Sequence, residues 1–187
     1  GGVTTYGYDA NGNLISVATP IGTTIFQYDT KGNVTAMTDP NNRTTVLAYD
    51  TQNNLTSVID PLGNAAGFTY DAAGNRLTMT DPLGHMTQFA YNALNQMTQV
   101  TDPKGNITRF TYDFEGNVLS TTDANGRPTE YEYNYLGQLT RITDALNKLT
   151  QLSYGPTGCG SGCGGADKLT ALTDALNHIT RFNYDLA

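Results

Sequence analysis

The chain has 187 residues, which is long enough for one sizeable domain. Ten Lys and Arg stand against 17 Asp and Glu, and the net charge of −7 argues against a nucleic-acid surface and against docking on an anionic membrane. No apolar run reaches the roughly 18 residues that a bilayer span needs, so we expect no membrane insertion. Twelve Tyr, 20 Gly and no Trp favour strands joined by tight turns.

A tyrosine recurs through the whole sequence at a nearly constant interval. The spacing is 20 residues once, then 21 residues six times, then 30 residues. The residue after this tyrosine is Asp in most repeats, Asn at positions 92 and 134, and Gly at position 155. The tyrosines are Tyr8, Tyr28, Tyr49, Tyr70, Tyr91, Tyr112, Tyr133, Tyr154 and Tyr184.

Each repeat carries two turn signals, of which Asp71-Ala-Ala-Gly74-Asn75 and Asp81-Pro82-Leu83-Gly84 are examples. Both suit a type I turn that is closed by a residue in the left-handed region, a common connection for a hairpin with a bulge. Ala replaces the Pro at positions 124, 145 and 175 and still fits such a turn. We therefore predict two antiparallel strands per repeat, each of about six residues, and roughly 17 strands in all.

The residues before each tyrosine alternate between two types. In one repeat, Thr108, Phe110 and Tyr112 are separated by polar residues, which predicts a strand with one apolar face. The second strand of the repeats carries an aliphatic residue at one equivalent position: Val17, Met37, Val58, Met79, Val100 and Ile142. Stacked repeats should therefore place aromatic and aliphatic ladders on one side of a continuous sheet.

The predicted fold is all-β, with tandem antiparallel β-hairpins forming one long curved sheet. We expect residues 1–187 to form a single array of about nine hairpin repeats, and the array to be a piece of a longer protein. Open twisted sheets rarely exceed about ten strands without curling. Because no helical segment is available to cover the apolar face, the sheet should curl around something or be covered by chain outside this sequence.

The repeated pattern Tyr-Asp-x-x-Gly-Asn followed by Thr-Asp-Pro-x-Gly resembles the Rhs/YD-repeat family over essentially the whole chain. The resemblance implies a sheet that spirals into a hollow shell, of which this chain would be a part. In bacterial Rhs toxins that shell encloses a C-terminal toxin, a similar cocoon does so in insecticidal toxin complexes, and in teneurins a YD barrel is part of an adhesion receptor. The self-cleaving aspartyl protease that ends an Rhs core is not recognisable here, because every Asp-Pro pair lies in a turn.

The one irregularity is a Gly-rich insertion at residues 155–167, which contains both cysteines, Cys159 and Cys163. They could form a local disulfide, worth only about 2 kcal/mol for so small a loop, or remain free thiols. They could also be half of a metal site, but a structural zinc needs four ligands and His85 and His178 are far away in sequence. Inter-chain crosslinking and a catalytic cysteine are the remaining alternatives.

Other chemistry has weak support. The chain has three Glu, at positions 115, 130 and 132. Glu130 and Glu132 fall on the same face of one strand, which suggests a solvated face rather than a glycosidase pair. No loop has an EF-hand or phosphate-loop pattern. The tyrosine ladder could stack sugars, so carbohydrate is a candidate partner. We expect no catalytic residues and no cofactor.

The leading functional hypothesis is a non-catalytic wall segment of an Rhs-type shell, whose partners are the remainder of a larger chain and its cargo. The alternative is an extracellular adhesin or a self-assembling filament whose partners are copies of itself, because unpaired strand edges invite strand addition. Both hypotheses place the chain outside the cell or at its surface. An enzyme is the least favoured hypothesis.

Overall fold

The computed structural model of the chain describes residues 2–155 and 168–184. These residues form 17 strands of a single antiparallel sheet, and no helix lies among them. The predicted all-β fold and strand number are confirmed. Among the same residues there is accordingly no helix that could cross a membrane.

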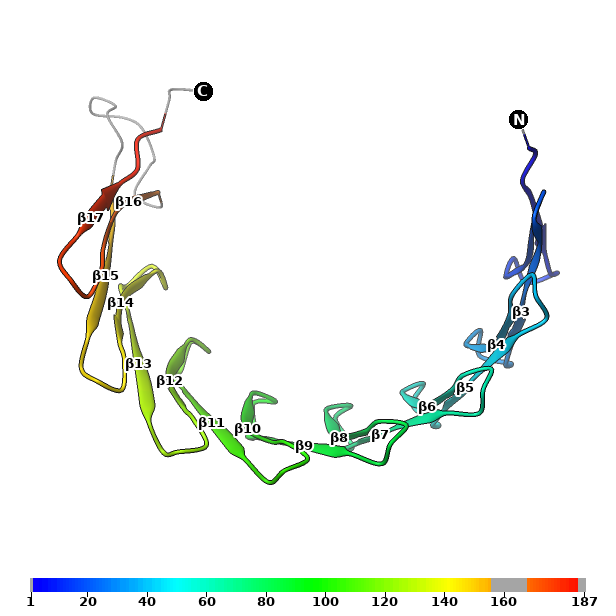
Figure 1. Cartoon of the computed structure of the whole chain (residues 1–187), viewed down its shortest axis with the longest axis horizontal. Helices are drawn as coiled ribbons and strands as arrows, with labels where there is room; N and C mark the ends of the chain where they lie inside the picture. The colour runs from blue at the N-terminus through cyan, green and yellow to red at the C-terminus, as the bar shows by residue number, and fades with distance from the viewer. Residues whose placement is uncertain (1, 156–167, 185–187) are drawn as a thin grey trace. The chain divides into compact units, whose positions relative to one another are not determined.

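The chain divides into two compact units, and the first comprises residues 1–90 and 102–104. Within it each strand pairs with its neighbours in sequence, and the strip of hairpins bends along its length (Figure 1). Its strands are β1 (Thr5–Tyr8), β2 (Leu14–Thr19), β3 (Gly22–Tyr28), β4 (Val34–Thr38), β5 (Thr44–Tyr49), β6 (Leu55–Ile59), β7 (Ala65–Tyr70), β8 (Arg76–Thr80) and β9 (Met86–Tyr91).

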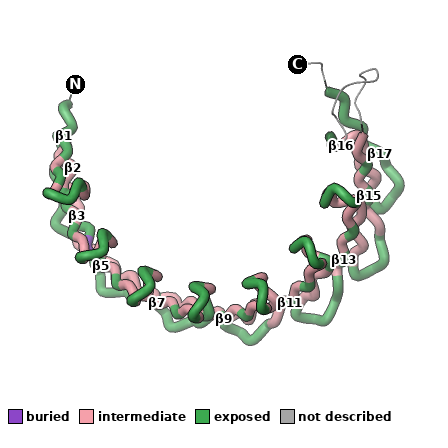
Figure 2. The backbone as a smooth tube through the Cα atoms, turned by 180° about the vertical axis from the view of Figure 1, so that it is seen from behind, coloured by how far each residue is buried: buried purple, intermediate pink, exposed green. Residues whose placement is uncertain are grey.

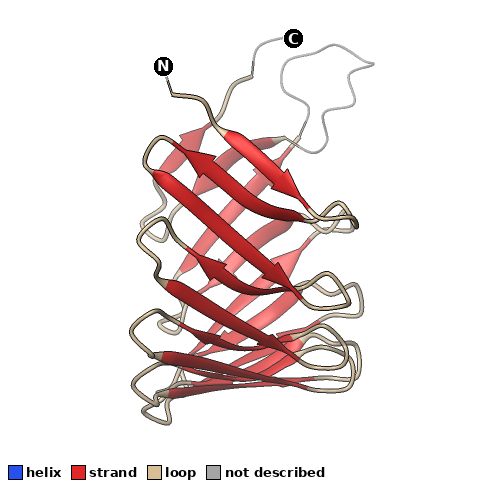
Figure 3. Ribbon diagram, turned by 90° about the vertical axis from the view of Figure 1, so that its right-hand side faces the viewer, coloured by secondary structure: helices blue, strands red, loops and turns tan. Residues whose placement is uncertain are grey.

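The second unit comprises residues 91–101 and 105–187 and repeats the same hairpin plan. Its strands are β10 (Met97–Thr101), β11 (Ile107–Tyr112), β12 (Val118–Thr122), β13 (Pro128–Tyr133), β14 (Leu139–Thr143), β15 (Leu149–Tyr154), β16 (Leu169–Thr173) and β17 (Ile179–Arg181). The turn that follows each tyrosine lies at one edge of the strip, and the second turn lies at the other edge (Figure 3).

The tyrosine-bearing strands from β3 to β15 alternate as predicted. In β3, Thr24, Phe26 and Tyr28 are half-buried, whereas the residues between them are exposed. The first and last of these strands, β1 and β17, are mostly exposed and do not follow the pattern. The strands that follow the tyrosine turn do not alternate in this way either, and all five residues of β14 and of β16 are half-buried. One-sided burial therefore holds for the first strand of the interior repeats only.

A single bulge interrupts seven of the hairpins whose first turn follows a tyrosine. Gln27 lies opposite Ala36 and Tyr28 lies opposite Val34, so Thr35 has no partner across the ladder. Side chains alternate between the two faces with a period of two, so the bulge absorbs one extra residue and keeps Met37 on the same face as Phe26. The equivalent extra residues are Ile15, Thr56, Leu77, Leu119, Thr140 and Thr170.

The strand-pairing register shifts by two residues from one repeat to the next. Phe26 lies opposite Met37, and Met37 lies opposite Thr45, two residues before Leu47, which is the equivalent of Phe26. A register shift of two residues, each about 3.3 Å long, across two strand spacings of about 4.8 Å each means that the strands are inclined by about 35°. Strands in closed barrels have a similar tilt. The local geometry within each unit is thus that of a coiling wall.

The first repeat is one residue shorter because its second turn is tighter. Thr19 pairs directly with Gly22, whereas the equivalent turn of the next repeat pairs Asp39 with Arg43. The tyrosine spacing of 20 in place of 21 therefore reflects a shorter turn and no change in strand register.

The sheet is one layer thick and has almost no closed core. Ala36, at 9% exposure, is the only buried apolar residue among those described. The strands are mostly half-buried and the turns are exposed (Figure 2). Cross-strand pairs and contacts between neighbouring repeats must therefore supply most of the stability, as in other repeat proteins.

Candidate functional site

In four of the repeats, the repeated tyrosine joins its hairpin to the preceding one through its hydroxyl group. Tyr133 Oη donates a hydrogen bond of 3.0 Å to the carbonyl oxygen of Val118, the first residue of β12. Burial is the main cause that raises the pKa of the Tyr133 phenol, which keeps this donor protonated. The same bond runs from Tyr28 to Leu14, from Tyr112 to Met97 and from Tyr184 to Leu169, at 2.6–2.9 Å.

The acceptor of this bond has a defined place in the repeat. Val118 also lies opposite Tyr112 of its own hairpin, directly beside the bulged residue Leu119. A bulge disrupts the ladder of backbone hydrogen bonds locally, and a phenol from the next repeat brings a donor to that place. The tyrosine is therefore a fastener between repeats, with an apolar ring and a polar tip.

The turn after the tyrosine is organised by the following aspartate. Asp71 Oδ1 accepts hydrogen bonds from the backbone N–H groups of Ala73 and Asn75, and its Oδ2 accepts one from Asn75 Nδ2, all at 2.9 Å. These donors, the Asn75 side chain first, lower the pKa of the Asp71 carboxyl. The carboxylate is thus a structural anchor of the turn.

The second turn uses the same bonds with a variable partner. Asp39 forms an ion pair with Arg43 at 2.6 Å, and Asp81 Oδ2 lies 2.9 Å from His85 Nδ1. His178 contacts Asp174 in the same way at 3.0 Å. Both histidines thus occupy a turn position that Arg or Asn fills in other repeats, which accounts for them without a metal site. Among the described residues no group of three or more His, Cys, Asp or Glu could hold a metal ion.

The structure places Glu115 and Glu132 at the lining of one hollow, described below, and Glu130 beside Glu132 on the same strand. Glu130 and Glu132 are exposed on one face of β13, as predicted from the alternation. Glu132 Oε1 pairs with Arg141 Nη1 of β14 at 3.1 Å, across the hairpin. Cys159 and Cys163, with the insertion around them, lie outside the described residues, so the disulfide and metal alternatives remain predictions.

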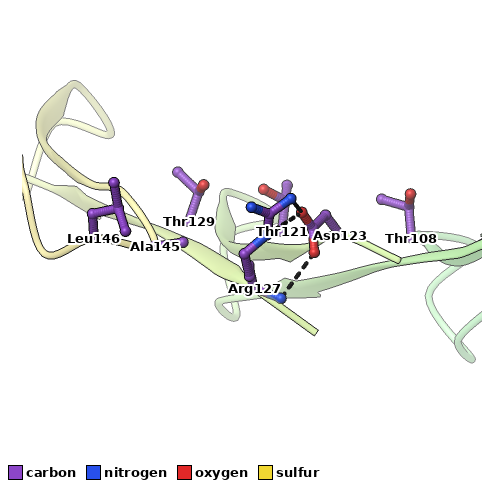
Figure 4. A pocket seen from close by; sticks show the side chains of 7 residues that line it. All are labelled: Thr108, Thr121, Asp123, Arg127, Thr129, Ala145 and Leu146. Carbon is purple, nitrogen blue, oxygen red and sulfur yellow. Dashed lines mark hydrogen bonds and ion pairs between the residues drawn. The ribbon is translucent and has the colours of Figure 1, made fainter. Parts of the chain in front are cut away.

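Two hollows lie in the second unit, and the first, of about 230 Å³, lies near its second turns. Thr108, Thr121 and Thr129 line it together with Ala145, Leu146 and an ion pair between Arg127 and Asp123 (Figure 4). Thr121 pairs with Phe110 and Thr129 across the sheet, at the position where other repeats have Val, Met or Ile. A smaller side chain in this ladder therefore helps to open the hollow.

The second hollow, of about 580 Å³, lies between the tyrosine turns of neighbouring repeats. Phe114 and Tyr135 are at the tips of these turns and are 91% and 88% exposed. The remaining lining residues are Asp113, Glu115, Leu119, Tyr131, Glu132, Tyr133 and Asn134. Sequence reasoning from the shared pattern missed both hollows, because the residues that make them are those that depart from it.

A cation–aromatic contact joins two repeats in the first unit. The Arg76 guanidinium lies 5.1 Å from the ring centre of Phe89 and 6.0 Å from that of Phe68. Arg76 begins β8 at a position that Leu or Val fills in most other repeats. Its charged group therefore lies against the aromatic ladder, where such contacts stabilise the face.

Comparison with known proteins identifies the family to which this repeat belongs. The family model described as the teneurin YD-shell matches residues 2–155. The chain belongs to the YD-shell family. The resemblance to the Rhs/YD repeats is thereby confirmed, and the hydrogen bond from the YD tyrosine to the preceding repeat gives it a physical basis. No curated protein matches the chain.

Solved structures share the fold of this YD-repeat chain. A crystal structure of TcdB2-TccC3-TEV aligns with a TM-score of 0.56 and 16% identity over 97% of the chain. TcdB2-TccC3 without its hypervariable C-terminal region aligns with a TM-score of 0.50 and 15% identity over 91% of the chain. The chain spans only 12% of the length of either protein. At this identity the likeness concerns the fold alone.

Proposed function

We propose that this chain is a non-catalytic wall segment of an Rhs-type shell that encloses a toxin or another cargo. The observation that carries the proposal is the join between repeats, in which a tyrosine hydroxyl of one hairpin bonds the backbone of the preceding hairpin. Such a bond links the repeats into a continuous surface, and it occupies the tyrosine hydroxyl, which is the most regular polar group of the repeat. In this role the larger shell chain and its cargo are the partners, and the protein acts outside the cell.

The thinness of the sheet supports the same role. With only Ala36 buried among the described apolar residues, each face is open to a further layer or to an enclosed volume. The strand tilt of about 35° that follows from the register favours coiling over a flat sheet. Neither property suits an enzyme, whose site needs side chains converging in a closed cleft.

Protease protection of the parent protein tests this proposal. The full-length protein that contains this segment should protect a separate domain from added protease when it is native, and should release that domain to cleavage after mild denaturation. A parent in which every domain is cleaved at the same rate before and after denaturation would contradict enclosure.

A second candidate function is a surface recognition module, such as an adhesin. The observation that favours it is the exposure of Phe114 and Tyr135, which contribute nothing evident to their turns.

Electron microscopy of the purified chain separates the self-assembling filament from the other roles. Dispersed particles at all concentrations would exclude the filament.

A further inference from the structure

Two neighbouring repeats of the second unit present large aromatic side chains where the other repeats do not. Phe114 and Tyr135 occupy the second position of their turns, and their side chains lie almost entirely in solvent. A type I turn accepts most residues at this position, so the turn itself needs no ring. The other described tyrosine turns have Ala10, Thr30, Thr51, Ala72 and Ala93 at this position.

The hollow between these turns is large enough for a ligand. Its volume of about 580 Å³ falls within the usual range of about 300–1,000 Å³ for small-ligand sites. Tyr131, Tyr133 and Leu119 contribute to its walls, so aromatic and aliphatic surface predominates. We call it the Phe114–Tyr135 hollow.

The spacing of the two rings suits an extended ligand. Equivalent residues of adjacent repeats are separated by two strand spacings and a two-residue shift in register, which together give about 12 Å. This distance is close to the length of a disaccharide in a linear β-linked glycan. Two rings at this spacing would therefore stack on alternate sugars of one glycan chain.

The charges around the hollow distinguish a neutral ligand from an anionic one. The Asp113 carboxylate accepts hydrogen bonds from Glu115 N, Asn117 N and Asn117 Nδ2 at 2.8–2.9 Å. Glu132 pairs with Arg141. Of the three carboxylates that line the hollow, Asp113 and Glu115 have no ion pair among the described residues, so the lining keeps a net negative charge. This charge disfavours an anionic ligand, and the Glu115 oxygens remain as acceptors for hydroxyl groups.

We propose that the Phe114–Tyr135 hollow binds a linear, neutral, β-linked glycan. Alternate pyranose rings stack on Phe114 and Tyr135, and the Glu115 carboxylate accepts hydrogen bonds from sugar hydroxyls. Glycan binding at this hollow is independent of the wall function, because a shell can form with or without a glycan site.

Isothermal titration calorimetry of the full chain with cellohexaose and with chitohexaose tests this site. At least one hexaose should bind with a dissociation constant below about 1 mM, and the disaccharide, which cannot cover both rings, should bind at least about tenfold more weakly. The double variant Phe114→Ala/Tyr135→Ala should lose at least about tenfold in affinity. The control variant Leu62→Ala/Leu83→Ala removes two other exposed apolar side chains from turns and should bind like the wild type.

Three outcomes overturn the proposal. One is the absence of binding by either hexaose at about 1 mM. Another is binding that the double variant leaves unchanged while circular dichroism shows both proteins folded. The third is binding of decalysine, abolished by the double variant, without binding of either hexaose, which would assign the hollow to basic peptides.

Discussion

At the scale of single residues, the repeated tyrosine has two separate roles. Its ring continues the aromatic ladder, a role that Phe fills equally well two positions earlier in several strands. Its hydroxyl reaches the backbone of the preceding hairpin, which Phe cannot do. In the four repeats where this bond forms, the choice of Tyr over Phe therefore follows from the carbonyl that the hydroxyl contacts.

Replacing Tyr133 by Phe isolates the hydroxyl. We expect Tyr133→Phe to lower the free energy of unfolding by about 0.5–1.5 kcal/mol, the usual net value of one hydrogen bond, because the Val118 carbonyl loses its donor. Urea denaturation followed by circular dichroism measures the change. Tyr135→Phe is the matched control, since Tyr135 is 88% exposed and should change stability by less than about 0.5 kcal/mol. Equal effects of the two substitutions would contradict the fastening role.

At the scale of the element, each tight turn among the described residues contains one residue in the left-handed region. Gly84 has a φ of +82°, and no atom lies within 4 Å of the place where a Cβ would stand. Asn fills the equivalent position in other turns, with φ between 59° and 69° at Asn42, Asn53, Asn95, Asn147 and Asn177. The requirement is thus on the backbone angle, and Asn meets it where Ala would not.

Substitutions at Gly84 test that requirement directly. Gly84→Ala should lower the free energy of unfolding by about 1–2 kcal/mol, the cost of a left-handed conformation for a residue with Cβ. Gly84→Asn should lower it by less than half as much, because Asn tolerates this region. Thermal and urea denaturation of the two variants measure the difference. If Asn proved as destabilising as Ala, the backbone angle would not be the cause.

The bulge absorbs one residue of β4, so deleting that residue should be tolerated where deleting a paired residue is not. Without Thr35, Tyr28 stays opposite Val34 and Phe26 stays opposite Met37 in a regular ladder, and we expect the free energy of unfolding to fall by less than about 1 kcal/mol. Without Gln27, Phe26 and Tyr28 become neighbours in sequence and point to opposite faces. We expect this second deletion to cost at least about 3 kcal/mol and to speed amide hydrogen exchange in β3 and β4. Equal protection in the two variants would contradict the role of the bulge.

At the scale of the whole molecule, the sequence allowed the strands and turns to be predicted because both depend on local chemistry. Asp, Pro and Gly mark the turns, and alternation marks strands such as β3. The turn signals indicated a hairpin with a bulge, but the position of the bulge could not be predicted, because Ile15, Thr35 and Leu77 at that position share no chemical signature. The acceptor of the tyrosine hydroxyl depends on the register between repeats, which no local pattern specifies. The two hollows depend on exceptions such as Thr121 and Phe114, whose consequences appear only when neighbouring repeats are placed side by side.

The turn carboxylates make the stability of the whole array depend on pH. Hydrogen bonds from the following turn residues lower the pKa of ten aspartates from 3.8: Asp9, Asp29, Asp39, Asp50, Asp60, Asp71, Asp81, Asp113, Asp123 and Asp174. A pKa that is lower in the folded state contributes stability above the unfolded value and loses it as the pH falls through the folded value. The loss should therefore begin near pH 4 and grow below it.

Urea denaturation at a series of pH values from neutral to about 2 measures this loss. The midpoint should fall steadily below pH 4. Net charge adds to this fall, because the chain carries −7 at pH 7 but becomes positive below its isoelectric point of about 4.5, where further protonation increases the repulsion. Asp71→Asn separates the two causes, because the chain itself uses Asn at the equivalent positions 92 and 134. This variant should show a smaller acid loss than the wild type, and an equal loss in the two proteins would show that the turn hydrogen bonds do not control the acid stability of the repeats.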